Sequence, residues 1–179
     1  MGFSLHFMHI EAGGETGGSD RDGLARFLDS RGLHLSEDNL CCFLMNADGS
    51  AMTLDGHTTD LNLDPLNKEG EVSGSIWHAH LGREECQFIY DLCVAGGFLI
   101  VNPQGSPMFI VVNHNHEESD LPDVGELPAW VESADELADV LGSPFDNFIE
   151  YRDRVLATHN AAQSTPTTSK PRWWDRFWR

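Results

Sequence analysis

The spacing of apolar residues changes from a period of two to a helical period and back again along this chain. Short segments with the composition or alternation of strands cover residues 4–10, 40–45, 51–54, 61–63 and 75–81. From Glu84 to Ala95 the apolar residues Phe88, Ile89, Leu92 and Cys93 follow helical spacing instead. Residues 98–101 and 108–112 then predict another hairpin. This order predicts an α+β fold with a single, mostly antiparallel sheet and helices packed on it.

Turn and cap residues mark the expected boundaries of the elements. Asp48-Gly49 predicts a hairpin turn between residues 40–45 and 51–54. Asp20 is placed to cap a short helix that ends before Gly32, and Gly96-Gly97 ends the helix that begins at Glu84. Ser133 and Glu136 form a capping box for a helix that reaches Leu141. Ser143-Pro144 predicts the start of a second helix, which gives the chain a C-terminal helical segment.

Composition divides the chain into three parts. Residues 1–159 have the apolar content of one folded domain, since 179 residues suffice for one hydrophobic core plus a tail. Residues 160–171 are rich in Ser, Thr and Pro and predict a flexible linker. Residues 172–179 form a basic, aromatic tail motif. No internal repeat is visible.

The charge of the chain is its most unusual bulk property. Asp and Glu number 29 against 11 Lys and Arg, which gives a formal net charge of −18. Nucleic acid is therefore a poor partner, because binding phosphate backbones requires clustered basic residues. A basic protein fits better, since complementary fields speed association. Such acidity also favours solubility alone, and that alternative stays open.

The acidity concentrates in one part of the chain. Residues 84–151 contain no Lys or Arg, and residues 117–139 are the most densely acidic. Trp130 lies within this segment and offers an apolar anchor for an interface. The alternative is a solvated loop with Trp130 in the core. The predicted partner-binding residues are Glu117, Glu118, Asp120, Asp123, Glu126, Trp130, Glu132, Asp135 and Glu136.

The last ten residues differ from the rest in charge and in aromatic content. Residues 170–179 carry a net charge of +3, whereas residues 1–169 carry −21. Trp173, Trp174, Phe177 and Trp178 would share one face of a short helix. Such a tail could dock into a groove, lie on a membrane interface or bind its own acidic domain. It could equally be a helix end that packs locally.

Cysteine usage and hydropathy predict a cytoplasmic protein. Cys41, Cys42, Cys86 and Cys93 form no Cys-x-x-Cys pair and lie in apolar stretches, where a free thiol behaves as a small hydrophobe. No segment approaches the roughly 20 apolar residues that a membrane span needs, and the N-terminus lacks the pattern of an export signal. We expect no cofactor. The oligomeric state does not follow from the sequence.

Two His-x-His pairs carry an alternative, enzymatic interpretation. His78 with His80, and His114 with His116, lie in predicted strands, where alternate side chains face the same way and could share a metal with Glu84 or Glu118. The spacing of His78, His80 and Glu84 resembles the first cupin motif, and Gly97, Pro103 and Gly105 resemble part of the second. That resemblance implies a metal-dependent enzyme. Met108 stands where the second motif would supply histidine, and the stretch between the motifs is short.

In general pattern, the chain resembles a class of bacterial binding proteins. Small size, acidity, α+β pattern and the lack of a catalytic motif over residues 4–159 are similar to immunity proteins of polymorphic-toxin, contact-dependent and type VI secretion systems. The resemblance implies that the chain binds and neutralises a cognate toxin. The acids of this chain would then cover the basic active site of the toxin. A third hypothesis is an adaptor or chaperone that recruits an effector through residues 170–179.

Overall fold

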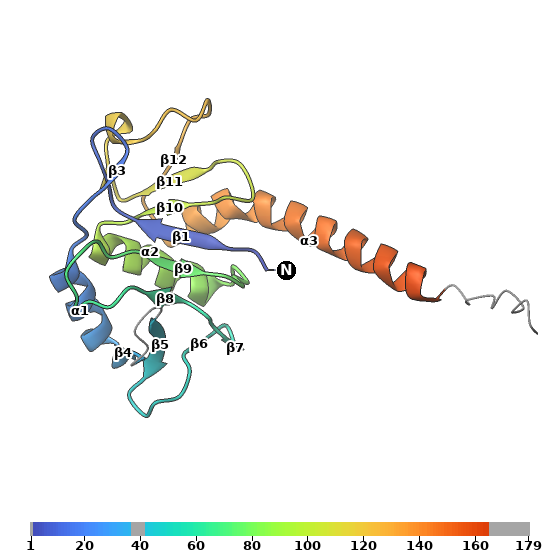
Figure 1. Cartoon of the computed structure of the whole chain (residues 1–179), viewed down its shortest axis with the longest axis horizontal. Coiled ribbons are helices and arrows are strands. Elements are labelled where there is room, and N and C mark those ends of the chain that lie inside the picture. Colours follow the sequence, from blue (N-terminus) through green and yellow to red (C-terminus); the bar gives the residue numbers. More distant parts are fainter. Residues whose placement is uncertain (1, 37–41, 165–179) are drawn as a thin grey trace, which may run out of the picture. The chain divides into compact units, whose positions relative to one another are not determined.

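The predicted α+β class is confirmed by an eight-stranded mixed sheet with three α-helices. The computed structural model describes residues 2–36 and 42–164 (Figure 1). The sheet order is β12-β11-β10-β1-β9-β8-β5-β4, and every pairing is antiparallel except β11 with β12. Its strands are β1 (Leu5–Met8), β4 (Leu33–Leu35), β5 (Cys42–Asn46), β8 (Asn62–Leu63), β9 (Gly74–Ile76), β10 (Leu99–Val101), β11 (Phe109–Val112) and β12 (Ala129–Val131).

Two small ribbons and four helical segments complete the described fold. The ribbons pair β2 (Ile10–Glu11) with β3 (Glu15–Thr16), and β6 (Thr53–Leu54) with β7 (His57–Thr58). The helical segments are α1 (Arg21–Ser30), α2 (Arg83–Gly96), the 3-10 helix η1 (Glu118–Asp120) and α3 (Ala134–Ser164). None of the helices in the described part of the chain is both long enough and apolar enough to cross a membrane.

The strand register separates the sheet into two different faces. One row across it contains Cys42, Leu63, Gly74, Phe7, Ile100 and Ile110. The neighbouring row, which points to the other side because side chains alternate, contains Phe43, Asn62, Ser75, His6, Val101 and Phe109. The first row is apolar and faces the helices. The second mixes aromatic, polar and aliphatic residues.

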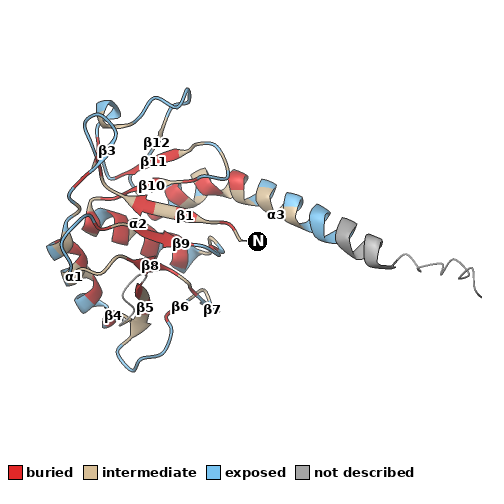
Figure 2. Cartoon of the chain, in the orientation of Figure 1, coloured by how far each residue is buried: buried red, intermediate tan, exposed pale blue. Residues whose placement is uncertain are grey.

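The main core lies between the helices and the first face of the sheet (Figure 2). Leu24 and Leu28 of α1, Phe88 and Leu92 of α2, and Leu137 of α3 all contribute to this core. A second, smaller cluster lies on the other face, where Ile10, Leu99 and Phe109 pack with Met8, Val101, Met108 and Leu121. That cluster covers the β10–β11 part of the second face.

The predicted boundaries of α1 and α2 and the predicted second hairpin are confirmed. The Asp20 carboxylate accepts the N–H of Gly23 and caps α1, and Gly32 follows the helix with a φ of 65°. The helix predicted over residues 84–95 is α2, which ends at Gly97 in the left-handed conformation. The hairpin predicted from residues 98–101 and 108–112 is β10 with β11.

The hairpin predicted at Asp48-Gly49 is only partly present. The turn forms, but the returning chain pairs with β5 through a single bridge, Met45 to Ala51. β6 pairs instead with β7, across Asp55 and Gly56, which have φ values of 50° and 77°. Two residues with positive φ make the tight turn that twisted hairpins favour. The second Asp-Gly pair, Asp55-Gly56, therefore makes β6 turn back to pair with β7 rather than with β5.

The two helices predicted on either side of Gly142 are one helix, and the prediction of a break at Ser143-Pro144 was wrong. Pro144 lacks an N–H, yet α3 continues through it. Phe145 and Phe148 pack edge-on against Phe3, with ring centroids 5.4 and 5.7 Å apart. These ring contacts stabilise the turn of α3 that follows Pro144. The helix also extends through Ser164, into the stretch predicted as a linker from residue 160.

The chain divides into two compact units, residues 1–148 and residues 149–179. The first holds the sheet, α1, α2 and the beginning of α3. The second holds the rest of α3, where Tyr151 and Leu156 are more than half exposed. The predicted division at residue 159 stays a prediction.

Close approach of α1 to α2 depends on a glycine. A Cβ at position 23 would overlap the carbonyl oxygen of Ala95 in α2. Ala ordinarily stabilises a helix interior by about 1 kcal/mol relative to Gly. A decrease in the free energy of unfolding on substitution of Gly23 would therefore report the packing clash. We expect Gly23→Ala to lower the free energy of unfolding by about 1–3 kcal/mol, because the helices must separate. Denaturant titration measures it. Gly18→Ala, where no atom lies within 4 Å of the added Cβ, is the control, and equal stability of the two variants would contradict this account.

Candidate protein-binding surface

The acids predicted to bind a partner lie in the segments that precede and follow the edge strand β12 in the chain. Glu117, Glu118, Asp120, Asp123 and Glu126 precede it, and Glu132, Asp135 and Glu136 follow it. Seven of the eight are exposed and Asp120 is half-buried. Residues 126 and 132 are at most roughly 20 Å apart, because an extended residue spans about 3.3 Å. We call these eight acids and Trp130 the acidic surface.

Trp130 lies beside His114, which in turn contacts Glu132. Its ring is 6.0 Å from that of His114, and its exposed fraction is 39%. The Nε2 atom of His114 lies 2.7 Å from Oε1 of Glu132. Glu136 accepts the backbone N–H of Glu132. The structure thus brings Trp130, Glu132 and Glu136 together, and it adds His114, which the sequence offered only as a metal ligand.

The segment before β12 forms a second, hollowed part of the acidic surface. Glu117 and Asp120 bond each other's backbone N–H in a capping box around η1. Glu126 accepts the N–H of Met108. A cavity of about 280 Å³ is lined by Glu118, Leu121, Pro122, Asp123, Gly125, Glu126, Leu127 and Pro128. The Leu127 side chain on its rim is 79% exposed. Apolar contacts are therefore available among the acids.

Two side chains attach this segment to the sheet. Asn115 donates to the carbonyl oxygen of Phe98 at 2.5 Å. His116, which is 4% exposed, accepts the N–H of Ile10 at its Nε2, and its Nδ1 lies 2.8 Å from Oδ1 of Asn115. Both ring nitrogens of His116 thus have a partner when the imidazole is neutral. The ring of His9 packs against the ring of His116, with centroids 4.7 Å apart. Burial lowers the pKa of His116 to about 4, and the neighbouring His9 acts in the same direction.

The strand predicted over residues 75–81 ends at Ile76, and the His-x-His pairs do not lie in strands. His78 and His80 follow β9, and His114 lies in a turn where Asn113 and His114 have φ values of 50° and 54°. His116 follows that turn. Alternate side chains therefore do not face one way here, contrary to the prediction.

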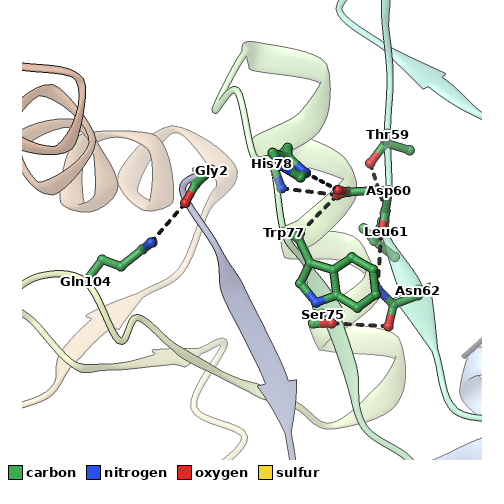
Figure 3. Close-up of polar contacts among 9 residues, drawn as sticks. All are labelled: Gly2, Thr59, Asp60, Leu61, Asn62, Ser75, Trp77, His78 and Gln104. Atoms are coloured by element: carbon green, nitrogen blue, oxygen red, sulfur yellow. Dashed lines mark hydrogen bonds and ion pairs between the residues drawn. The ribbon is translucent and has the colours of Figure 1, made fainter. Parts of the chain in front are cut away.

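Carboxylates explain why β9 ends where it does. Asp60 accepts the backbone N–H groups of Trp77 and His78, and its other oxygen lies 2.5 Å from Nδ1 of His78 (Figure 3). Glu85 accepts the N–H groups of His80 and Leu81. These N–H groups bond to side chains, so they cannot bond to a neighbouring strand. The chain leaves the sheet at this point.

A third carboxylate begins α2. Asp55 accepts the N–H groups of Glu84 and Glu85, while its own N–H bonds to Glu84. The N-cap residue, Gly82, has no side chain to offer, so the Asp55 turn supplies the cap from 27 residues earlier. Glu85 is 2% exposed, and this burial raises the pKa of its carboxyl.

The proposed metal ligands are therefore engaged separately. His78 bonds to Asp60, His80 stacks on His57 with centroids 4.4 Å apart, and Glu84 bonds to Asp55. His114 and His116 bond to Glu132 and Asn115. Within residues 2–36 and 42–164, no three His, Cys, Asp or Glu side chains are grouped to hold a metal ion. Residues 83–96 are helical, so the cupin-like spacing spans a loop and a helix start rather than strands.

The fold and surface describe an α+β protein with an acidic edge around an aromatic residue. Comparisons with protein-family models, with curated proteins and with solved structures found no match to this chain. The predicted tail residues Trp173, Trp174, Phe177 and Trp178 lie outside the described residues.

Sequence reasoning missed the residues that hold these elements in place. Asp60 and His78 are 18 residues apart, and only the pairing of β8 with β9 brings them together. Glu132 and His114 are also 18 residues apart and meet because β12 lies parallel to β11. The Asp55-Gly56 pair was a usable signal for the hairpin between β6 and β7.

The bonds of His116 predict acid sensitivity. An unfolded His titrates near pH 6.5, whereas the native pKa of His116 is about 4. As the pH falls below about 6.5 the unfolded state binds a proton first, so stability decreases until the pH passes the native pKa. We expect His116 to contribute a loss of about 2 kcal/mol in the free energy of unfolding between about pH 7 and about pH 5.

The measurement is urea unfolding at a series of pH values. His116→Gln keeps an acceptor for the N–H of Ile10 but does not titrate, so its stability should change less over this range. His34→Gln, at an exposed position on β4, should keep the pH dependence of the unaltered chain. If both variants follow the unaltered chain, His116 is not the source of the acid sensitivity.

Proposed function

We propose that this chain is a protein-binding domain that receives a basic protein on the acidic surface. One observation carries the proposal: exposed acids precede and follow the partly exposed Trp130 along the chain, in a stretch of 68 residues without Lys or Arg. A basic partner meets attraction over the whole surface. An acidic partner or a nucleic acid is repelled.

The surface combines the two components that protein interfaces use. Exposed acids retain their hydration in the free protein and attract a partner at distances of about 8 Å at physiological salt. Trp130 and Leu127 supply apolar area that can be buried on contact. The nearby cavity of about 280 Å³, with acids and apolar residues in its lining, is suited to a Lys or Arg side chain of the partner.

The more specific proposal is that the partner is a bacterial toxin and that the chain is its immunity protein. Its small size, its acidity and the α+β fold support this class. A toxin that cleaves or modifies nucleic acid presents a basic active site, and an acidic surface covers such a site by charge complementarity. Cys86 and Cys93 are buried free thiols, which agrees with the reducing cytoplasm as the place of action.

Charge reversal tests the acidic surface. Glu118 and Asp135 are exposed, and they precede and follow β12 in the chain. We expect the combined change Glu118→Lys and Asp135→Lys to weaken binding to a basic partner, the product of the neighbouring gene, by about tenfold or more at low salt, mostly through slower association. Surface plasmon resonance at about 0.05 M and about 0.5 M salt measures both rates, and the difference should shrink at high salt.

A matched variant controls for net charge. Glu69→Lys with Glu71→Lys makes the same charge change at two exposed positions outside the acidic surface. It should bind nearly as well as the unaltered chain. Equal weakening by both pairs would mean that bulk charge, not this surface, governs binding. For the toxin proposal, co-expression of the chain must restore growth to cells that carry the neighbouring gene, and a failure to protect them contradicts it.

A further inference from the structure

The outer part of α3, from residue 149 onward, carries an apolar stripe that is largely exposed (Figure 2). Tyr151 is 53% exposed, Val155 39% and Leu156 52%. Residues three or four apart lie side by side on a helix, so these side chains form one row with the half-buried Arg152. None of the four belongs to either core cluster of the described residues. We call Tyr151, Arg152, Val155 and Leu156 the outer stripe.

The outer stripe continues a side of α3 that is covered earlier in the helix. Phe145 and Phe148 pack on Phe3, with ring centroids 5.4 and 5.7 Å apart. Tyr151 and Arg152 follow Phe148 by three and four residues, so they extend the same side of the helix. Amphipathic helices in proteins gain most of their stability from packing of the apolar side. This side of α3 is therefore suited to a second packing partner beyond residue 148.

The last eight residues of the chain have a matching apolar side. Residues 172–179 comprise four aromatic and four charged residues. At helical spacing the aromatic residues fall on one side: Trp173, Trp174, Phe177 and Trp178. The charged residues fall on the other side: Arg172, Asp175, Arg176 and Arg179. Each Trp or Phe side chain can bury about 150–250 Å², so contact with the outer stripe removes apolar surface from water on both segments.

The chain between the two apolar sides has the length that an antiparallel contact needs. At about 1.5 Å per residue, Leu156 lies about 12 Å and Tyr151 about 20 Å from the end of α3. Residues 165–172 span up to about 26 Å when extended. A chain that reverses within them can place Trp173 beside Leu156 and Trp178 beside Tyr151. Both pairs of positions are five residues apart, which is about 8 Å at helical rise.

We propose that residues 172–179 fold back and dock their aromatic side on the outer stripe of α3 in the same molecule. Residues 149–164 contain two acids and two bases, so the basic tail meets no net repulsion there. Arg152 pairs with Asp153 at 2.8 Å, and its guanidinium offers a flat surface on which a Trp ring can stack. The proposal does not depend on the acidic surface or its partner.

The covalent link decides between this occupant and a separate molecule. A short linker holds a tethered segment at an effective concentration of about 1 mM. A contact within one chain therefore needs far less area than the roughly 800 Å² on each partner that separate molecules bury. The tail reaches the outer stripe of its own chain before that of another.

Hydrogen exchange of the full chain tests the contact from the side of α3. Changing the four aromatic residues of the tail to Ser should make the backbone amides of residues 150–157 exchange about tenfold faster or more, because the uncovered end of the helix opens more often. The amides of α2 should keep their rates. Arg172→Ser with Arg176→Ser, on the charged side of the tail, is the control and should leave residues 150–157 unchanged.

Tryptophan emission tests the contact from the side of the tail. A chain in which Phe replaces both Trp residues outside the tail reports on the tail alone. In that chain, Tyr151→Ser with Leu156→Ser should shift the emission to longer wavelength, because the tail returns to water. Glu150→Ser with Ala157→Ser changes two exposed positions on the opposite side of the helix and should leave the emission unchanged. This pair controls for weakened helix formation.

The conditions of the emission measurement distinguish other occupants. The emission should be the same from about 1 µM to about 100 µM protein and from about 0.1 M to about 1 M salt. A dependence on protein concentration would assign the contact to a second copy, and release at high salt would assign it to the acidic surface. Emission of water-exposed Trp that changes only with vesicles containing phosphatidylserine would assign the tail to a membrane surface.

Each of these three results overturns the proposal, and so do unchanged exchange rates in the variant without tail aromatics. Failure of the acidic surface to bind a basic protein leaves all of these outcomes unchanged.

Discussion

Three carboxylates that accept backbone N–H groups organise the centre of this fold. Asp60 holds the N–H groups of Trp77 and His78, Glu85 holds those of His80 and Leu81, and Asp55 holds those of Glu84 and Glu85. Ala79 between them donates to the carbonyl oxygen of Phe3. Hydrogen bonds to a charged group contribute roughly 1.5–3 kcal/mol each, so this short segment is tightly constrained. Its path ends β9, leaves Trp77 partly exposed and begins α2, so the position of α2 in the core depends on it.

The acidity of the chain therefore has two physical meanings. Asp20, Asp55, Asp60 and Glu85 serve the fold, because they complete hydrogen bonds that the backbone leaves open. Exposed acids can meet a partner whether or not they accept a backbone N–H group: Glu118 and Asp135 accept none in the described structure, whereas Glu126 and Glu136 accept one each and are still exposed. A net charge counts both groups equally. Glu85 illustrates the difference, since it belongs to the base-free stretch and yet is 2% exposed.

The extent to which the sequence predicts this structure depends on the range of the interactions involved. The cap at Asp20, the helix α2 and the hairpin of β10 with β11 follow from residues close together in the chain, and they were predicted correctly. The helix α3 continues through Pro144, and Phe145 packs there on Phe3, more than 140 residues away; this continuity was missed. The parallel strand β12 was missed because Ala129–Val131 is too short to show alternation. The acidic residues were predicted from composition, but their bonds to His114, Met108 and Glu132 were not.

The acidic surface is supported by other elements than the segment that Asp60 holds in place. The acidic surface depends on β12, on η1 and on the anchors Asn115 and His116. Asp60 acts on the end of β9, which pairs with β8 and β1. The strands β10 and β11 lie between β12 and β1, and Leu99, Phe109 and Leu121 cover that part of the second face with an apolar cluster. Two strands and a separate apolar cluster therefore lie between the support of the acidic surface and the segment that Asp60 fixes. Substitutions of exposed acids at the sheet edge can change partner binding without disturbing the bonds that end β9 and begin α2.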